Sequence, residues 1–174
     1  MARGGMGEGT GGLSVADHWG LFGPDHLPYR ILLLGRMLDR LTAQHVRSVG
    51  DMAVAEWRVL AHLAQMGERS ASAVSAAALV ERSEVSRAVA RLTADGLVHA
   101  RPNPANARSR LLSLTEAGRA RFAATRAARL GFFATVMQGF TPDEAAALDG
   151  ALLRIAQQVE RMGQLPPSDM GETI

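Results

Sequence analysis

The 174-residue sequence contains no cysteine. This absence excludes disulfide bonds, thiolate metal sites and a cysteine redox switch, and it is typical of cytoplasmic proteins. The sequence also lacks an apolar run of about 18 residues, so we expect no membrane span. Its histidines, at positions 18, 26, 45, 62 and 99, show no metal-ligand spacing. We therefore expect a cytoplasmic protein without a metal or cofactor.

Signals of catalysis are missing as well. There is no cysteine nucleophile, no Gly-x-Ser-x-Gly motif, and no histidine in a motif with a nucleophile or a metal partner. Gly7, Gly9 and Gly12 match the Gly-x-Gly-x-x-Gly spacing of dinucleotide sites, but no strand precedes them and no crossover unit follows. We therefore predict that the chain is not an enzyme.

Lysine is absent too, so all 19 basic residues are arginines, and they are unevenly distributed. Residues 80–130 hold ten arginines and four acids, a net charge of +6, whereas the rest holds nine arginines and thirteen acids, a net charge of −4. A basic segment in an otherwise acidic chain favours a localised surface that binds a polyanion. The alternative is a solvated arginine face on a helix.

Hydrophobic spacing predicts a long first helix at about residues 25–49. Its apolar residues are alternately four and three apart, which forms one seam suited to packing against another helix. The seam consists of Leu27, Ile31, Leu34, Leu38 and Leu41. A second helix is expected from about Ala53 to Gln65, with its end at Gly67. Its predicted buried residues are Trp57, Leu60, Ala61 and Leu63.

Two shorter helices follow, at about 72–79 and 81–92, and the short turn between them is typical of a helix-turn-helix unit. We expect Ser83 to cap the second of these helices and Asp95-Gly96 to end it. Its predicted buried stripe is Val85, Val89 and Leu92.

The period then changes to that of strands. Residues 97–101 and 110–114 are extended runs, and the turn formers between them indicate a β-hairpin, or wing. A long helix is expected from Thr115, with Ser113-x-x-Glu116 as its capping box. The segment Thr141-Pro142-Asp143-Glu144 predicts the start of a last helix, which runs to about residue 162. The apolar face of that helix is Leu148, Leu152, Ile155 and Val159.

Together these elements predict a mainly α protein with a small β-hairpin, in which a winged helix-turn-helix core is flanked by long dimerisation helices. We expect a single domain between a flexible glycine-rich arm and a flexible tail. The predicted boundaries are 1–24 for the arm, 25–164 for the domain, about 53–114 for its DNA-reading head, about 25–49 and 115–162 for dimerisation, and 165–174 for the tail.

Three sequence segments carry a family pattern. They are Glu56-Trp57-Arg58-Val59-Leu60, then Val85-Ser86-Arg87-Ala88-Val89 with Leu92 and Gly96-Leu97-Val98, and then Leu114-Thr115-Glu116-Ala117-Gly118. In this order they resemble the second helix, the recognition helix with the first wing strand, and the wing-to-helix junction of the MarR family of bacterial transcriptional regulators. The resemblance covers about residues 27–162 and implies a winged-helix regulator that binds DNA as a homodimer.

Two positions depart from that family pattern. The family usually has an aspartate two residues before the wing arginine, where this chain has Asn106 before Arg108. Asparagine offers a hydrogen bond but no ion pair, so we expect Arg108 to be held less rigidly. The family often has a polar helix cap at the position of Ala53, and we expect Asp51 to take that role.

With its buried stripe inward, helix 81–92 presents a polar face that fits the major groove of DNA. We predict that Ser86 and Arg87 contact bases and that Arg108 enters the minor groove. The other predicted DNA-binding residues are Arg82, Ser83 and Arg91 near phosphates, Glu84 on the same face, and Arg101 and Arg110 as phosphate contacts on the strands. Two alternatives stay open: Arg87 pairs with Glu84, and Arg108 is a solvated loop charge.

These observations predict a sequence-specific, ligand-responsive repressor that binds a palindromic operator on double-stranded DNA as a homodimer. The seams of the first and the last two helices would form the two-fold interface. The family resemblance implies a pocket for a small aromatic effector, although Trp57 also fits the core. The candidate lining residues are Trp19, Tyr29, Arg30, Trp57 and His62. Two other functions stay open: a sequence-indifferent architectural DNA-binding protein and a winged-helix module for protein interaction.

Overall fold

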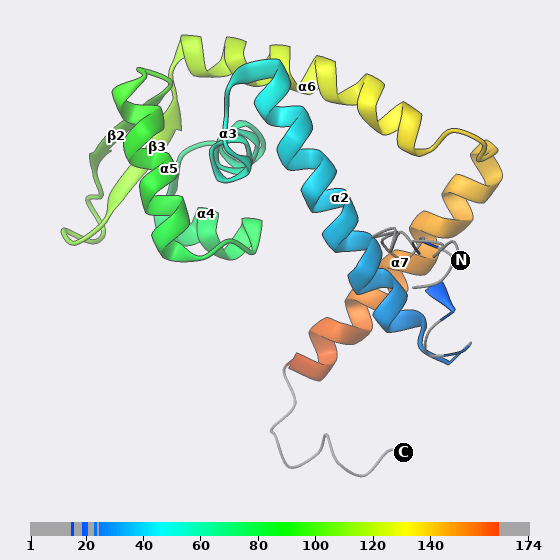
Figure 1. The fold of residues 1–174 in the computed structure, drawn as a ribbon. Helices are drawn as coiled ribbons and strands as arrows, with labels where there is room; N and C mark the ends of the chain where they lie inside the picture. Colours follow the sequence, from blue (N-terminus) through cyan, green and yellow to red (C-terminus); the bar gives the residue numbers. More distant parts are fainter. Residues whose placement is uncertain (1–14, 16–18, 21–22, 24, 164–174) are drawn as a thin grey trace, which may run out of the picture. The chain divides into compact units, whose positions relative to one another are not determined.

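The computed structural model describes residues 15, 19, 20, 23 and 25–163 (Figure 1). It is mainly helical with a small antiparallel sheet, which confirms the predicted fold class. The elements are α2 (Leu27–Gly50), α3 (Val54–Met66), β1 (Arg69–Ser70), α4 (Ala71–Ala78), α5 (Arg82–Ala94), β2 (Val98–Pro102), β3 (Arg110–Leu114), α6 (Glu116–Val136) and α7 (Pro142–Gly163). Most of the predicted arm and the whole predicted tail lie outside the described residues.

The chain divides into two compact units, residues 1–122 and 123–174, and the boundary falls within α6. The first unit holds the elements from α2 to the first turns of α6, and the second holds the rest of α6 and α7. Among the helices that the structure describes, none is long and apolar enough to cross a membrane.

The sheet of the first unit has the strand order β1-β3-β2. In the β2–β3 hairpin Val98 pairs with Leu114 and Pro102 pairs with Arg110. The predicted wing is therefore confirmed, with its first strand one residue further along. The sequence analysis does not predict β1, because a strand of two residues is too short to display an alternating pattern.

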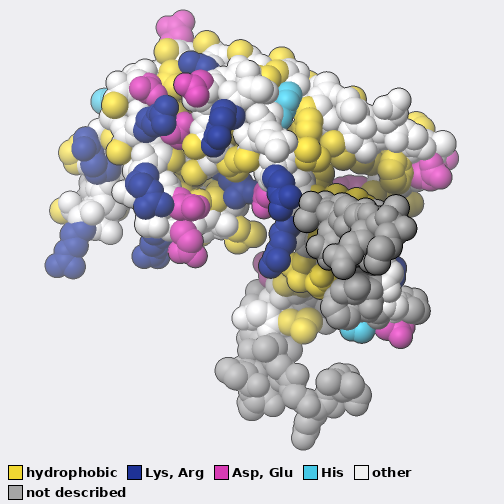
Figure 2. Space-filling model, in the orientation of Figure 1, with side chains coloured by type: hydrophobic (Ala, Val, Ile, Leu, Met, Phe, Trp, Pro, Cys, Tyr) yellow, Lys and Arg dark blue, Asp and Glu magenta, His cyan; other side chains and the backbone are white. Residues whose placement is uncertain are grey.

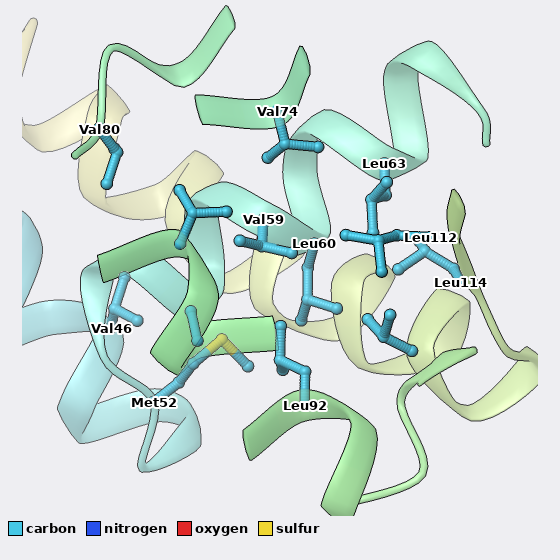
Figure 3. Packing of buried hydrophobic residues seen from close by; sticks show 13 residues of the cluster. Val46, Met52, Val59, Leu60, Leu63, Val74, Val80, Leu92, Leu112 and Leu114 are labelled. Atoms are coloured by element: carbon cyan, nitrogen blue, oxygen red, sulfur yellow. The ribbon is translucent and has the colours of Figure 1, made fainter. Parts of the chain in front are cut away.

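The hydrophobic core of the first unit forms where α3, α5 and the sheet meet (Figure 3). Leu60 of α3, Leu92 of α5 and Leu112 of β3 are its largest fully buried side chains. Full burial of one such side chain stabilises a fold by about 1.5–3 kcal/mol. The core thereby fixes the orientation of α5, and with it the direction in which the opposite face of this helix points.

The predicted burial in α3 is partly correct. Leu60 and Leu63 are buried as expected, but Trp57 and Ala61 are only half-buried. Val59 is fully buried instead. The buried face of α3 is therefore rotated relative to the prediction, and this helix packs against α2, α4, α5 and β3.

Two expectations for α5 are wrong. Its buried stripe contains Ala88, which is 4% exposed, in place of Val89, which is half-buried. The helix begins at Arg82 with Glu81 in the capping position, so Ser83 lies inside the first turn and does not cap it. The predicted end at Asp95-Gly96 is confirmed, and Gly96 has a φ of +68° there.

The entry into α6 also differs from the prediction. The backbone N of Gly118 donates to Oγ1 of Thr115 at 3.0 Å, so Thr115 caps the helix. Ser113 does not, because it lies in β3 and is paired with His99. A residue inside a strand ladder lacks the position from which it could reach the first turn of the next helix.

The second unit contains the helix start that the sequence marks most clearly. The backbone N of Thr141 donates to Oε2 of Glu144 at 2.8 Å, and the backbone N of Glu144 donates to Oγ1 of Thr141 at 3.3 Å. This reciprocal pair confirms the predicted capping box, and α7 begins at Pro142. Among the described residues of α7, none is buried.

Apolar side chains remain exposed on α2 and α7, two of the three predicted interface helices. On α2 they include Leu27, Leu34 and Leu41, and on α7 they include Leu148, Leu152 and Val159. Contiguous exposed apolar rows are uncommon on monomeric proteins and indicate a surface for a partner.

Candidate nucleic-acid interface

The outward face of α5 is polar and exposed. Burial of Val85, Ala88 and Leu92 turns the remaining positions of this helix away from the core. All six α5 residues that were predicted to bind DNA are exposed: Arg82, Ser83, Glu84, Ser86, Arg87 and Arg91. Figure 2 shows arginine side chains along this part of the surface and on the hairpin.

The guanidinium of Arg87 is available to a ligand. None of the ion pairs found among the described residues includes Arg87 or Arg82. The alternative in which Arg87 pairs with Glu84 is therefore not what the structure contains. An arginine without an internal partner keeps both sides of its planar donor group for an external acceptor.

Arg91 is linked to a buried carboxylate. Its Nε lies 3.4 Å from Oε1 of Glu56, which is 6% exposed. The other carboxylate oxygen, Oε2, accepts a hydrogen bond from the backbone N of Ala53 at 2.9 Å. Glu56 therefore caps α3, a role that the sequence analysis wrongly gives to Asp51, which ends α2 with a φ of +45°. The signal for Glu56 was its place in the first turn of α3.

A groove of about 600 Å³ lies between α5 and the hairpin. Ser86 and Ala90 of α5 line one side, and Arg108 and Arg110 of the hairpin line the other. The structure thus brings the predicted base-contacting face of α5 and the predicted wing arginine to one groove, although they are about twenty residues apart in the sequence.

The tip of the hairpin is held by asparagine and serine. Nδ2 of Asn103 donates to Oγ of Ser109 at 2.8 Å, and the backbone N of Ser109 donates to the carbonyl oxygen of Asn106 at 2.9 Å. Oδ1 of Asn106 accepts from the backbone N of Arg108 at 3.0 Å. Asn106 therefore orders the backbone of Arg108, while the exposed guanidinium has no ion pair among the described residues.

The strand arginines are engaged within the sheet. Nε of Arg101 donates to Oε1 of Glu68 at 2.8 Å, and Nη2 donates to Oε2. Because of this pair, the pKa of Glu68 lies below its ordinary value and the pKa of Arg101 lies above its own. Nη2 of Arg110 donates to the carbonyl oxygen of Ala100 at 2.6 Å. The charge of Arg101 is thus compensated internally, whereas Arg110 keeps its net charge.

Three candidates for the effector pocket come from the start of the chain. Arg30 donates from Nε to the carbonyl oxygen of Trp19 at 2.9 Å, and its guanidinium carbon lies 5.9 Å from the Trp19 ring centroid. Tyr29 precedes Arg30 on α2 and is half-buried. Trp19 and Arg30 therefore form one cation–π contact.

The other two candidates lie on α3. The ring of Trp57 stacks on that of Phe122 with centroids 5.5 Å apart, and Trp57 packs against the hydrophobic core. Nδ1 of His62 lies 2.7 Å from the carbonyl oxygen of Arg58, one turn earlier. Trp57 thus has the core role that the sequence analysis kept as its alternative.

Comparison with known proteins gives a family match over the helix-turn-helix and the hairpin. Residues 50–109 match the model of the MarR family. The HTH-type transcriptional repressor IacR of Pseudomonas putida is 38% identical over 68 residues, which is 39% of this chain and 41% of IacR. The chain thus matches about two fifths of the length of this curated relative.

Solved structures match over more of the chain. MarR from E. coli in its apo form has a TM-score of 0.65 at 23% identity, and the match covers 74% of this chain and 95% of MarR. A cysteine-to-serine mutant of MarR complexed with operator DNA has a TM-score of 0.65 at 21% identity, over 82% of this chain and 99% of that one. BpsR of Bordetella bronchiseptica, whose DNA binding is regulated by 6-hydroxynicotinic acid, has a TM-score of 0.59 at 25% identity, over 71% and 98%. The chain is thus similar to the MarR family of transcriptional regulators over residues 50–109, and it shares the fold of these solved structures.

Proposed function

We propose that this chain is a sequence-specific transcriptional repressor that binds duplex DNA through α5 and the hairpin. The observation that carries the proposal is the groove lined by Ser86 and Arg108, together with the exposed Arg87, for which no ion pair is found among the described residues. In this arrangement α5 enters the major groove and the hairpin tip reaches the adjacent minor groove. The operator complex of E. coli MarR, a protein with the same fold, supports the proposal.

The exposed residues of α5 have different proposed roles. Ser86 and Arg87 contact base edges, and Arg87 can donate two hydrogen bonds to one guanine. Arg82 and Ser83, in the first turn, contact phosphates. Arg108 enters the minor groove, where the negative potential is concentrated. Arg91 contributes less, because Glu56 compensates part of its charge.

The DNA-binding species is proposed to be a homodimer on a palindromic operator. Two α5 helices related by two-fold symmetry would meet successive major-groove faces roughly 34–36 Å apart. The exposed apolar rows of α2 and α7 support this assembly, because pairing would remove them from water. Sedimentation at micromolar concentration tests it: twice the mass of one chain is expected, and the mass of a single chain would contradict the proposal.

The proposed effector is a small aromatic acid. BpsR, whose DNA binding responds to 6-hydroxynicotinic acid, supports this class of ligand. Trp19 and Arg30 offer a ring surface and a guanidinium for such a molecule. A melting-temperature screen of 6-hydroxynicotinic acid and phenolic acids, followed by operator release, tests it. A stabilising acid that also releases DNA is expected, and an inert series would contradict the proposal.

The decisive test of function starts from a random-sequence DNA library. The tightest duplex selected from it is compared in gel-shift assays with a scrambled duplex of the same length and composition. A specific regulator binds the selected duplex at least about a thousandfold more tightly. Equal binding to both duplexes would favour an architectural DNA-binding protein, and no binding to either would favour a protein-interaction module.

A further inference from the structure

A glutamate–arginine pair spans the sheet near the loop end of the β2–β3 ladder. Glu68 immediately precedes β1, Arg101 lies on β2, and β3 runs between these two strands. Both nitrogens of the Arg101 guanidinium that face Glu68 donate to its carboxylate, one to each oxygen. This bidentate pair therefore connects the segment before β1 with β2, although β1 and β2 do not pair directly.

The pair lies on the face of the sheet that points away from the core. Along β3, Leu112 and Leu114 are buried, whereas Leu111 and Ser113 are half-buried, so the two faces alternate. Arg101 is paired with Leu111 and shares its outer face. The side chains of Arg101 and Glu68 are 45% and 32% exposed. The core thus holds the inner face of the hairpin, and this ion pair links its outer face to the rest of the unit.

The backbone attachment on that side of the hairpin is short. β1 contributes only two residues, opposite Leu111 and Leu112, whereas the β2–β3 ladder contains five pairs. A ladder of two residues leaves the hairpin free to twist about its base. A side-chain link across β3 opposes this motion, because it ties β2 directly to the segment before β1.

We propose that Glu68 is a positioning residue for DNA binding: by holding Arg101 it fixes the hairpin in the orientation that presents Arg108 to DNA. This inference rests on the proposed function. Arg101 then acts as a brace within the protein, which replaces its predicted role as a phosphate contact.

Electrostatics alone predicts the opposite effect of removing Glu68. In Glu68→Gln, one negative charge is lost and Arg101 is freed for a phosphate, so DNA binding should tighten and the salt slope should steepen by about one. If Glu68 positions the hairpin, the same substitution weakens binding, because the hairpin must then be ordered when DNA binds. The sign of the change separates the two explanations.

The test is a double-mutant cycle on the tightest duplex selected from the random library. The variants are Glu68→Gln, Arg108→Ala and the two combined. Glu81→Gln is the control, because it removes an exposed acid for which no side-chain bond is found among the described residues. Glu68→Gln is expected to weaken binding at least about twofold, and the loss caused by Arg108→Ala should shrink by a similar factor in its presence. Glu81→Gln should not weaken binding.

Two further measurements keep the outcome independent of operator binding. In the free protein, amide hydrogen exchange of β2 and β3 should be faster in Glu68→Gln than in the wild type or in Glu81→Gln. Reversal of the pair in Glu68→Arg/Arg101→Glu should restore both slow exchange and operator affinity. Because the pair is exposed, the melting temperature should stay close to that of the wild type.

Tighter binding by Glu68→Gln, additive effects in the cycle, or unchanged hairpin exchange would each overturn the inference. If Arg108→Ala alone leaves binding to every duplex unchanged, the proposed role of the wing in DNA binding fails. Hydrogen exchange in the free protein then still decides whether Glu68 braces the hairpin.

Discussion

Gly118 lies in the first turn of α6, where this helix passes against the residue before β2. A Cβ at this position would lie 2.0 Å from the carbonyl oxygen of Leu97 and 3.0 Å from its carbonyl carbon. The same oxygen accepts hydrogen bonds from the backbone N of Thr115 at 3.1 Å and from its Oγ1 at 3.2 Å. The substitution Gly118→Ala would therefore push α6 away from the segment that follows α5.

The size of the effect follows from these contacts. Real Cβ contacts under 3.0 Å essentially never occur, so the two backbones must separate by about 1 Å. Overpacking of this kind costs about 1–3 kcal/mol, and each weakened hydrogen bond from Thr115 adds about 1 kcal/mol. Alanine favours a helix by roughly 0.5–1 kcal/mol over glycine, which offsets part of this. We expect a net destabilisation of about 2–4 kcal/mol, or roughly 5–15 °C in melting temperature.

Thermal unfolding followed by far-ultraviolet circular dichroism measures this difference. The matched control is Gly131→Ala in the same helix, where an added Cβ meets no atom within 4 Å. Helix propensity alone should leave Gly131→Ala at or above the wild-type melting temperature. If Gly118→Ala melts as high as Gly131→Ala, the close packing of α6 against Leu97 is refuted.

Three further predictions concern other parts of the chain. Leu79 has a φ of +50° and is 91% exposed, so Leu79→Gly should raise the free energy of unfolding by about 0.5–1 kcal/mol, and a lower urea midpoint would contradict this. Arg87→Ala should cost roughly 1–3 kcal/mol of operator binding and relax the base preference at one position per half-site. The control Arg40→Ala, at an exposed position on α2, should do neither. A uniform loss of binding across all DNA sequences would make Arg87 a phosphate contact. The pKa of Glu144 is lowered by hydrogen bonds from the backbone N and then the hydroxyl of Thr141, so its stabilisation of α7 is present above about pH 4.5 and is lost as the pH falls through the lower pKa of the folded chain. The melting-temperature difference between the wild type and Glu144→Gln should therefore disappear on acidification, and a constant difference would exclude this role.

Sequence signals were sufficient where the partners of a residue are also its neighbours in the chain. The start of α7 was predictable because Thr141 and Glu144, three residues apart, satisfy each other's backbone. The end of α3 was predictable because glycine favours the positive φ that ends a helix, and Gly67 has a φ of +69°. The hairpin strands were predictable because their extended pattern is interrupted by a dense group of turn formers.

The same signals failed where a neighbouring element competes for a residue. Ser83 is a good capping residue, but α5 starts at Arg82 with Glu81 in the capping position, so Ser83 lies inside the helix. Ser113 is also a good capping residue, but its pairing in β3 leaves the capping of α6 to Thr115. Capping preferences describe one helix end in isolation, and the positions of both adjacent elements decide which candidate is used.

The candidate site also contains features that were predictable from the sequence and features that were not. The exposed face of α5 followed from the hydrophobic period, since whatever lies opposite a buried stripe faces solvent. The ion pairs did not follow from the sequence. Glu56 of α3 pairs with Arg91 of α5, and Glu68 pairs with Arg101 across β3. Many carboxylates are available to each arginine in a sequence, and only the folded backbone selects one. Which arginines have an ion pair within the described part of the chain was therefore beyond sequence reasoning.

The turn at the tip of the hairpin is held by the uncharged side chains of Asn103, Asn106 and Ser109, whereas the ion pair of Glu68 with Arg101 links the hairpin to the segment before β1. Dissolved ions screen the attraction between charges, but they have little effect on hydrogen bonds between neutral amides and hydroxyls. Concentrated salt should therefore weaken the link between the hairpin and the segment before β1, while the tip keeps its shape. The tip would then move as a rigid unit and change the position of Arg108.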